Sequence, residues 1–147
     1  MKLKLIAILF FAFSTTTFAQ KASDILGVWF NEEKDAKIEV FENAGKYYGK
    51  IIWIKNNTNE DGTSPKLDSK NPDKELAKRT IEGTQILIGL EWDDDEWDDG
   101  EIYDPKSGKT YSCYAELQSE NELFVKGYIG FSMIGRSTVW TRASLKF

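Results

Sequence analysis

The sequence predicts an all-β protein: a single antiparallel meander barrel of about eight strands, with one long loop that can carry a short helix. Short runs rich in β-branched and aromatic residues alternate with clusters of Gly, Asn, Asp and Lys, and no segment predicts a long helix. The length, 147 residues, fits one domain. A sheet of this size normally closes or folds into two layers, and an eight-stranded barrel leaves room for one small ligand.

Residues 1–19 are expected to be a secretory signal peptide rather than part of the fold. Two lysines precede the apolar run 5–13, and small residues lead to Ala19, so Gln20 is the expected mature start. The alternatives are a retained membrane anchor or a buried first helix. The barrel domain is therefore expected over 20–147, and no later stretch is apolar enough to cross a membrane.

Eight runs are expected to form the strands, because each is rich in strand-forming residues and is bounded by turn-forming ones. The runs are 27–31, 36–42, 47–54, 84–92, 101–104, 110–118, 122–129 and 137–142. One helical turn, 23–26, leads into the first run, and a glycine-containing turn, 43–46, joins the second and third as a hairpin. Strict alternation along the third run puts Tyr47, Ile51 and Trp53 on one face.

The segment 56–80 interrupts the strand pattern. It holds two prolines, many polar residues and few apolar ones, and it is too long for a hairpin turn. A short helix is expected over 73–79, where Asp73 lies near the start and Arg79 near the end. Loops of this length tend to be mobile or to act as functional lids. Its polar residues fit either a lid network or a loop held by Asx-turns: Asp68, Asn71, Asp73 and Arg79.

The run 86–90 is apolar on both faces, whereas one face of a meander barrel normally meets water. Either the long segment covers the outer face of this strand, which we favour, or the patch meets a partner.

Composition excludes several classes of function. The chain has no histidine, which removes Ser-His-Asp catalysis, Cys-His catalysis and His-ligated metal sites. Its single cysteine, Cys113, cannot form an internal disulfide and is expected to be buried on its strand. The formal net charge is −5, and without the two lysines of the leader it is −7, which argues against nucleic acid as a partner.

The first and last strands carry a pair of residues that would close one end of the barrel. Gly27-Val28-Trp29 opens the first strand, Arg142 ends the last, and in a closed barrel these strands are neighbours. A guanidinium stacked on the indole of Trp29 would make a cation–π contact. This arrangement is similar to that of lipocalins and related calycin barrels.

A more specific resemblance covers nearly all of the chain after the leader. The matching motifs are Asp24–Trp29, Gly45–Ile51, Leu67–Pro72, Ile102–Cys113, Gly127–Gly130, Gly135-Arg136 and Trp140–Arg142. They resemble the bacterial domain-of-unknown-function family 2147, whose members are small exported proteins with a lipocalin-like β-barrel. The resemblance implies that fold and an envelope or secreted location. It implies no established activity, so no catalytic residue is carried over.

Several aromatic side chains and one arginine are candidates for holding a ligand in the barrel or at its mouth. Aromatic rings can bury an apolar body while their polar tips orient a head group, and an arginine can pair with a carboxylate. The candidates are Tyr48, Trp53, Tyr103, Tyr111, Tyr128, Arg136 and Trp140. The alternative is that the aromatic residues fill the core and Arg136 caps the barrel end.

The segment 91–101 contains eight acidic residues in eleven positions. A weak cation site is conceivable there, with Asp93, Asp95, Asp98 and Asp99 as ligands. The spacing does not match an EF-hand, because a loop started at Asp95 puts Lys106 at the twelfth position. The alternative, which we favour, is a solvated hairpin that keeps the barrel soluble. Adjacent acids on a hairpin tip are also poor candidates for paired acid–base catalysis, and no cofactor is expected.

The sequence therefore predicts an exported, non-enzymatic protein, periplasmic or extracellular, that binds a small apolar, lipid-like or amphipathic molecule in its barrel. The alternative is a cell-envelope interaction module with a filled barrel, and an acid-dependent hydrolase is the least favoured function. The sequence leaves the oligomeric state open.

Overall fold

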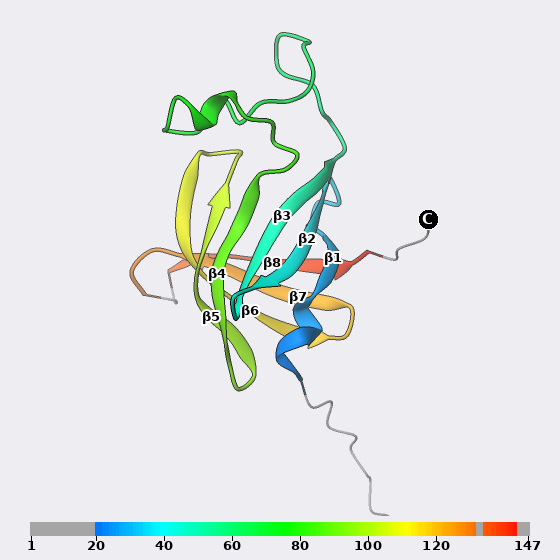
Figure 1. The fold of residues 1–147 in the computed structure, drawn as a ribbon, viewed down its shortest axis with the longest axis vertical. Coiled ribbons are helices and arrows are strands. Elements are labelled where there is room, and N and C mark those ends of the chain that lie inside the picture. Colours follow the sequence, from blue (N-terminus) through cyan, green and yellow to red (C-terminus); the bar gives the residue numbers. More distant parts are fainter. Residues whose placement is uncertain (1–19, 132–133, 144–147) are drawn as a thin grey trace, which may run out of the picture.

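Eight antiparallel strands close into one barrel in chain order in the computed structural model, which describes residues 20–131 and 134–143 (Figure 1). The expected signal peptide, 1–19, lies outside the described residues. The strands are β1 (Gly27–Phe30), β2 (Ala36–Asn43), β3 (Lys46–Ile54), β4 (Gln85–Asp93), β5 (Glu96–Asp104), β6 (Lys109–Ser119), β7 (Glu122–Tyr128) and β8 (Gly135–Arg142). The barrel closes where Trp29 of β1 pairs with Arg142 of β8.

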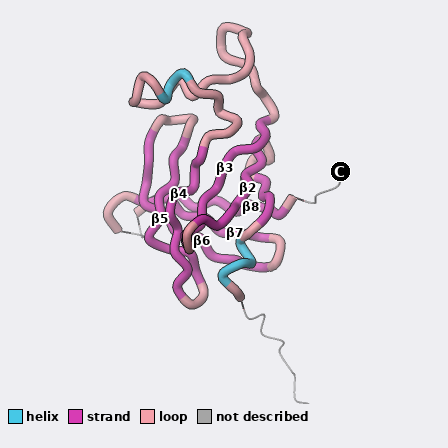
Figure 2. The backbone as a smooth tube through the Cα atoms, viewed as in Figure 1, coloured by secondary structure: helices cyan, strands magenta, loops and turns pink. Residues whose placement is uncertain are grey.

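The two short 3-10 helices lie outside the barrel wall, one before β1 and one in the long β3–β4 connection (Figure 2). The first, η1 (Ala22–Ile25), corresponds to the expected helical turn. The second, η2 (Leu76–Lys78), spans three residues, fewer than the expected helix 73–79. The carboxylate of Asp73 accepts the N–H groups of Glu75 and Leu76 and ties down the start of this turn. No described helix is long and apolar enough to cross a bilayer.

The acidic segment forms a β-hairpin, as favoured, but the fifth strand starts earlier than the expected residue 101. The fifth strand begins at Glu96, and β4 and β5 meet at a tight turn in which Asp94 adopts a positive φ of 52°. Trp92 and Trp97 pair across the hairpin with ring centroids 4.6 Å apart, and Trp97 is completely buried. Two inward-facing indoles therefore hold together the end of a hairpin whose other residues, over 91–99, are all acidic.

A β-bulge in β3 corrects the expected facing of Trp53. Ile38 pairs with Ile51 but its neighbour Lys37 pairs with Trp53, so β3 carries one extra residue, Ile52. The extra residue turns Trp53 to the outer face, where its ring meets Phe30 edge-on at 6.4 Å. Tyr47 and Ile51 share a face, as expected; it is the inward face, and each residue is 4% exposed.

Inward-facing side chains fill the interior of the barrel. Trp29, Trp97 and Leu87 are among the largest fully buried side chains. Cys113 is also buried, and its burial raises the pKa of the thiol to about 12. A Cβ added at Gly49 would lie 3.0 Å from Leu87, so neighbouring side chains already occupy that space. The interior at this depth is packed core.

The outer face of β4 is covered by the chain itself, as favoured. Leu87 pairs with the inward-facing Ile102, which places their neighbours Ile86 and Tyr103 on the outer face. Both are nonetheless buried, at 7% and 6% exposure, and the Tyr103 hydroxyl donates to Asp68 of the long connection. We call the β3–β4 connection, residues 55–84, the strap.

Candidate functional site

The two ends of the barrel differ in how they are closed. The η1 end holds the turns β2–β3, β4–β5 and β6–β7, and the opposite end, which we call the mouth, holds the connections β1–β2, β3–β4, β5–β6 and β7–β8. The strap lies over the mouth end (Figure 1).

The η1 end is sealed by Arg142. Its guanidinium lies over the Trp29 indole, 4.1 Å from the ring centroid. It also donates to the carbonyl oxygens of Asp24, Leu26 and Glu120 at 2.7, 2.9 and 2.7 Å. Burial lowers the pKa of Arg142 from its usual value. Each nitrogen of the guanidinium has an acceptor within the protein.

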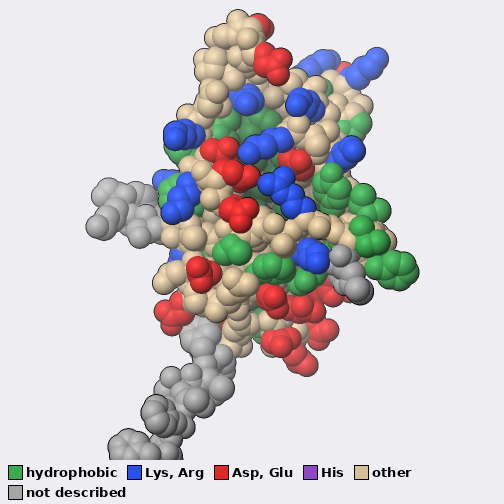
Figure 3. All heavy atoms as spheres, turned by 180° about the vertical axis from the view of Figure 1, so that it is seen from behind, with side chains coloured by type: hydrophobic (Ala, Val, Ile, Leu, Met, Phe, Trp, Pro, Cys, Tyr) green, Lys and Arg blue, Asp and Glu red, His purple; other side chains and the backbone are tan. Residues whose placement is uncertain are grey.

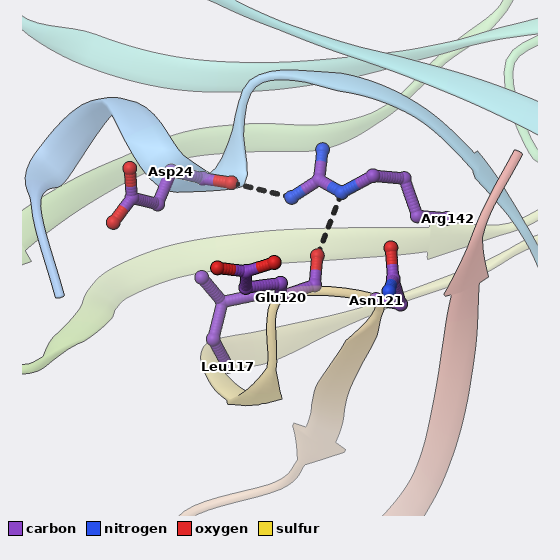
Figure 4. Close-up of a pocket in the computed structure, with 5 residues that line it drawn as sticks. All are labelled: Asp24, Leu117, Glu120, Asn121 and Arg142. Atoms are coloured by element: carbon purple, nitrogen blue, oxygen red, sulfur yellow. Dashed lines mark hydrogen bonds between the residues drawn. The ribbon is translucent and has the colours of Figure 1, made fainter. Parts of the chain in front are cut away.

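A cavity of about 340 Å³ lies beside this seal (Figure 4). Its lining residues are Asp24, Leu117, Glu120, Asn121 and Arg142. Three of the five N–H donors of the guanidinium in its wall already bind backbone carbonyls, and two of the lining residues, Asp24 and Glu120, are acidic. The cavity is therefore a gap beside a structural closure and not a preformed anion site.

An exposed ion pair bridges the mouth. Asp35 of the β1–β2 connection and Lys106 of the β5–β6 turn lie on opposite sides of the barrel by strand order, and their carboxylate and ammonium groups are 3.2 Å apart. Burial acts to raise the pKa of Asp35, but hydrogen bonds from Asn31 and Lys106 outweigh it and hold the pKa below its usual value. Because both side chains are largely solvated, the pair is weak and can separate.

Four inward-facing positions surround the interior at the mouth. Ile102 pairs with Tyr111, and Gly127 pairs with Arg136 of β8. A Cβ added at Gly127 would lie 3.0 Å from Ile102 and 3.4 Å from Tyr111, so these two side chains lean across the glycine. Ile102, Tyr111 and Gly127 are half-buried, whereas Cys113, one step deeper, is fully buried. We call Ile102, Tyr111, Gly127 and Arg136 the mouth site.

Arg136 is placed at this site by a close approach of two backbones. Gly135 lies so near the Gly127 carbonyl and Tyr128 that an added Cβ would clash with both. The guanidinium of Arg136 is 82% exposed, and its one acidic contact, Glu33, is at 3.5 Å. The Arg136 guanidinium thus makes only a weak contact with the protein and lies beside half-buried apolar side chains.

The other sequence candidates lie elsewhere. Trp140 faces inward but is deep in the core, at 3% exposure. Tyr48 faces outward and stacks on Phe41 at 5.8 Å, and Trp53 is turned outward by the bulge. Tyr128 is also on the outer face, because its neighbour Gly127 faces inward. The register therefore places these three on the outer face and not in the barrel interior, which was one of the two places expected for them.

Tyr103 also faces outward, and it anchors the strap. Its hydroxyl donates to the Asp68 carboxylate at 2.6 Å and accepts from Asn71 at 3.1 Å. Asp68 has no exposed surface and pairs with Arg79 at 2.9 Å. Burial, followed by the hydrogen bond to Asp68, raises the pKa of Tyr103 to about 12. Asp68, Asn71 and Arg79 thus form a network that holds the strap to Tyr103 on the outer face, and Asp73 makes an Asx-turn in the same segment.

The hairpin acids are not gathered for metal binding. No three acidic or cysteine side chains among the described residues are close enough to hold a metal ion. Asp93 and Asp98 lie on different strands, while Asp95 is in the turn and Asp99 occupies a bulge with φ of 55°. The structure therefore does not bring these four carboxylates together.

Sequence reasoning missed Ile102, Gly127 and the Asp35–Lys106 pair. The signal for Gly127 was present, because an isolated glycine in a strand often marks a close approach. The ion pair has no local signal, since its partners are 71 residues apart.

Two comparisons with known proteins match this architecture. The family model DUF2147, described as an uncharacterized protein conserved in bacteria, matches residues 27–142. A solved structure of Helicobacter pylori protein HP1028, described as belonging to the lipocalin family, is 25% identical. It superimposes with a TM-score of 0.70 over 82% of this chain and 84% of that one. No curated protein matches the chain. The chain belongs to the DUF2147 family and has a lipocalin-like fold.

Proposed function

We propose that this protein is an exported, non-catalytic binding protein that holds a small amphipathic molecule with an anionic head group at the mouth site. The observation that carries the proposal is the register of β8. It gives Arg136 an inward-facing position next to Gly127, where half-buried Ile102 and Tyr111 lie above a packed core.

The chemistry of the mouth site suits the two parts of such a ligand. Ile102 and the ring of Tyr111 offer apolar surface to a hydrocarbon body. The guanidinium of Arg136 can form two parallel hydrogen bonds with a carboxylate. Its contact with Glu33 is long and exposed, so a ligand carboxylate can replace it at small cost.

The packed core limits the size of the ligand. Because Cys113 and Val125 are fully buried below the mouth, a long chain cannot run down the barrel axis without repacking. A short molecule that lies across the mouth would leave this core unchanged. Entry then requires separation of the exposed Asp35–Lys106 pair.

A matched pair of probes tests this proposal. Calorimetry with decanoate and decanol compares two ligands with the same hydrocarbon body and different heads. We expect Arg136→Gln to weaken decanoate binding by about tenfold, the scale of one charge-assisted hydrogen bond, and to leave decanol binding unchanged.

Lys74→Gln, which removes an exposed charge from the strap, is the matched control and should affect neither ligand. Equal decanoate affinities for the wild type and Arg136→Gln would reject the head-group role of Arg136. Native mass spectrometry of protein from its own cells identifies the natural ligand class.

The alternative function, protein interaction by a filled barrel, has its own support. The core is packed at Gly49 and at Gly100, where an added Cβ would lie 2.7 Å from Leu90. The interaction would then use the outer surface, and the two functions are compatible because they occupy different parts of the barrel.

A further inference from the structure

The loop between β7 and β8 exposes three large apolar side chains. Ile129, Phe131 and Ile134 are 70%, 79% and 67% exposed. Figure 3 shows hydrophobic side chains gathered and projecting on this side of the molecule. We call these three residues the apolar loop. Projecting groups of this kind, when not scattered singly, mark contact surfaces.

An aromatic row continues from the apolar loop along the outer face of β6 and β7. The Tyr114 ring lies 6.3 Å from Tyr128 and 6.0 Å from Phe124, measured between centroids. Tyr128 is directly followed by Ile129, so the row ends where the apolar loop begins, and we call the two together the strip. Aromatic rings favour contact with both apolar groups and cations.

Acidic residues flank this strip on β4, β5 and β6. Asp93 lies opposite Glu96 across the hairpin, and Glu91 lies opposite Asp98. The register of β5 and β6 brings Glu116 next to Glu96. Like charges directly opposite one another destabilise a sheet. Figure 3 shows acidic side chains clustered beside the apolar side chains.

The field of these acids reaches the aromatic row. Burial and then the charges of Asp98 and Asp99 raise the pKa of Tyr128. Burial and then neighbouring acids also raise the pKa of Glu96. Lys126, opposite Tyr114, is a positive charge within the strip, but it is outnumbered by the acids around it.

We propose that the apolar loop, the aromatic row and the flanking acids form a docking surface for a cationic amphipathic segment of a partner protein. The apolar face of the segment packs on Phe131 and Ile134. Its lysine or arginine side chains lie over Tyr114 and pair with Glu96 and Glu116. Charge complementarity selects this occupant, because an anionic membrane surface is repelled by the same acids.

The test uses a fluorescent amphipathic helix made of leucine and lysine. Fluorescence anisotropy follows its binding to the full protein at low and high salt. We expect binding that weakens as salt rises, because the charges involved are exposed. The scrambled peptide of the same composition, and the peptide with glutamate in place of lysine, should bind at least about tenfold more weakly.

Paired variants separate the two parts of the surface. F131S/I134S removes exposed apolar groups and should weaken binding by about tenfold at both salt concentrations. E96Q/E116Q should weaken binding at low salt and flatten the salt dependence. The controls L76S and E75Q change an exposed apolar and an exposed acidic residue on the strap and should leave binding unaltered.

Each contrary outcome overturns the proposal. The docking surface would be rejected if the scrambled peptide bound as tightly as the amphipathic peptide, or if both paired variants bound the amphipathic peptide as the wild type does. It would also be rejected if the amphipathic peptide did not bind. Binding of phosphatidylcholine vesicles through Phe131 and Ile134, without peptide binding, would assign the apolar loop to a membrane instead. None of these outcomes depends on Arg136, so the proposed ligand site is tested separately.

Discussion

The two ends of the barrel use the same kind of group, a basic side chain, for closures of very different strength. At the η1 end Arg142 stacks on Trp29 and reaches three backbone carbonyls. At the mouth, Lys106 and Arg136 each meet one exposed carboxylate. A half-buried cation with several hydrogen bonds stabilises a fold, whereas exposed pairs contribute little and exchange readily. Arg142 therefore has a structural role at the η1 end, and the weaker contacts at the mouth support the proposal that a ligand enters there.

The largest effect is expected for the strap, which covers the mouth end and is anchored to the barrel by one buried acid, Asp68. Asp68→Ala removes the partner of Arg79, Tyr103 and Asn71 and should destabilise the protein by about 3–5 kcal/mol, the usual range for breaking a buried ion pair. Urea unfolding measures the change, and limited proteolysis within the strap locates it. Glu60→Ala, an exposed acid of the same segment, is the matched control. A loss below about 1 kcal/mol would show that Asp68 does not anchor the strap.

The closure at the η1 end should be the next most sensitive. Arg142→Met keeps an unbranched apolar stem but leaves three carbonyl oxygens without a donor and removes the cation–π contact, for a loss of about 3 kcal/mol. Arg136→Met, the same change at the mouth, should cost less than about 0.5 kcal/mol. Thermal and urea unfolding of the two variants compare the ends directly. Equal losses would remove the distinction between them.

Alkaline pH should weaken the attachment of the strap. The pKa of Tyr103 is about 12 in the folded protein, against about 10 for an unperturbed tyrosine. Below about pH 10 the phenol is protonated in both states, and between about pH 10 and 12 the unfolded state releases the proton first, so stability falls as pH rises. Urea midpoints across this range should fall less steeply for Tyr103→Phe than for the wild type. Tyr48→Phe, on the outer face of β3, is the control, and equal slopes for Tyr103→Phe and the wild type would contradict the assignment.

The smallest effect on stability is expected at the ion pair that bridges the mouth. Lys106→Gln should change the free energy of unfolding by less than about 1 kcal/mol, because both partners are exposed. Its effect should appear in kinetics, as faster association and dissociation of decanoate in stopped-flow fluorescence. A large loss of stability with unchanged ligand kinetics would make the pair a structural closure like that of Arg142.

The sequence was sufficient to predict the class of fold because alternation and turn residues are local signals. All eight strands were expected, and seven begin and end within two residues of the observed bounds. The prediction that Trp29 and Arg142 are neighbours followed from closure of a meander, which brings the first and last strands together. These features need no knowledge of side-chain packing.

The remaining features depend on contacts between distant residues. The extra residue Ile52 reverses the facing of Trp53, and no local pattern distinguishes it from a regular strand residue. The first part of β5 was not predicted, because Asp has a low strand propensity. The burial of Trp97 outweighs that propensity. Tyr103 was a candidate for the interior or the mouth, and no local pattern indicates that its hydroxyl binds Asp68, 35 residues away on the strap.

Chemical-shift mapping with decanoate tests the central claim most directly, because it reports on both ends of the barrel in one experiment. Titration into isotopically labelled protein should shift the backbone amides of Tyr111, Gly127 and Arg136. It should leave those of Asp24 and Arg142 at the η1 end unchanged. Shifts confined to the cavity beside Arg142, or no shifts at saturating ligand, would contradict the assignment of the mouth as the binding site.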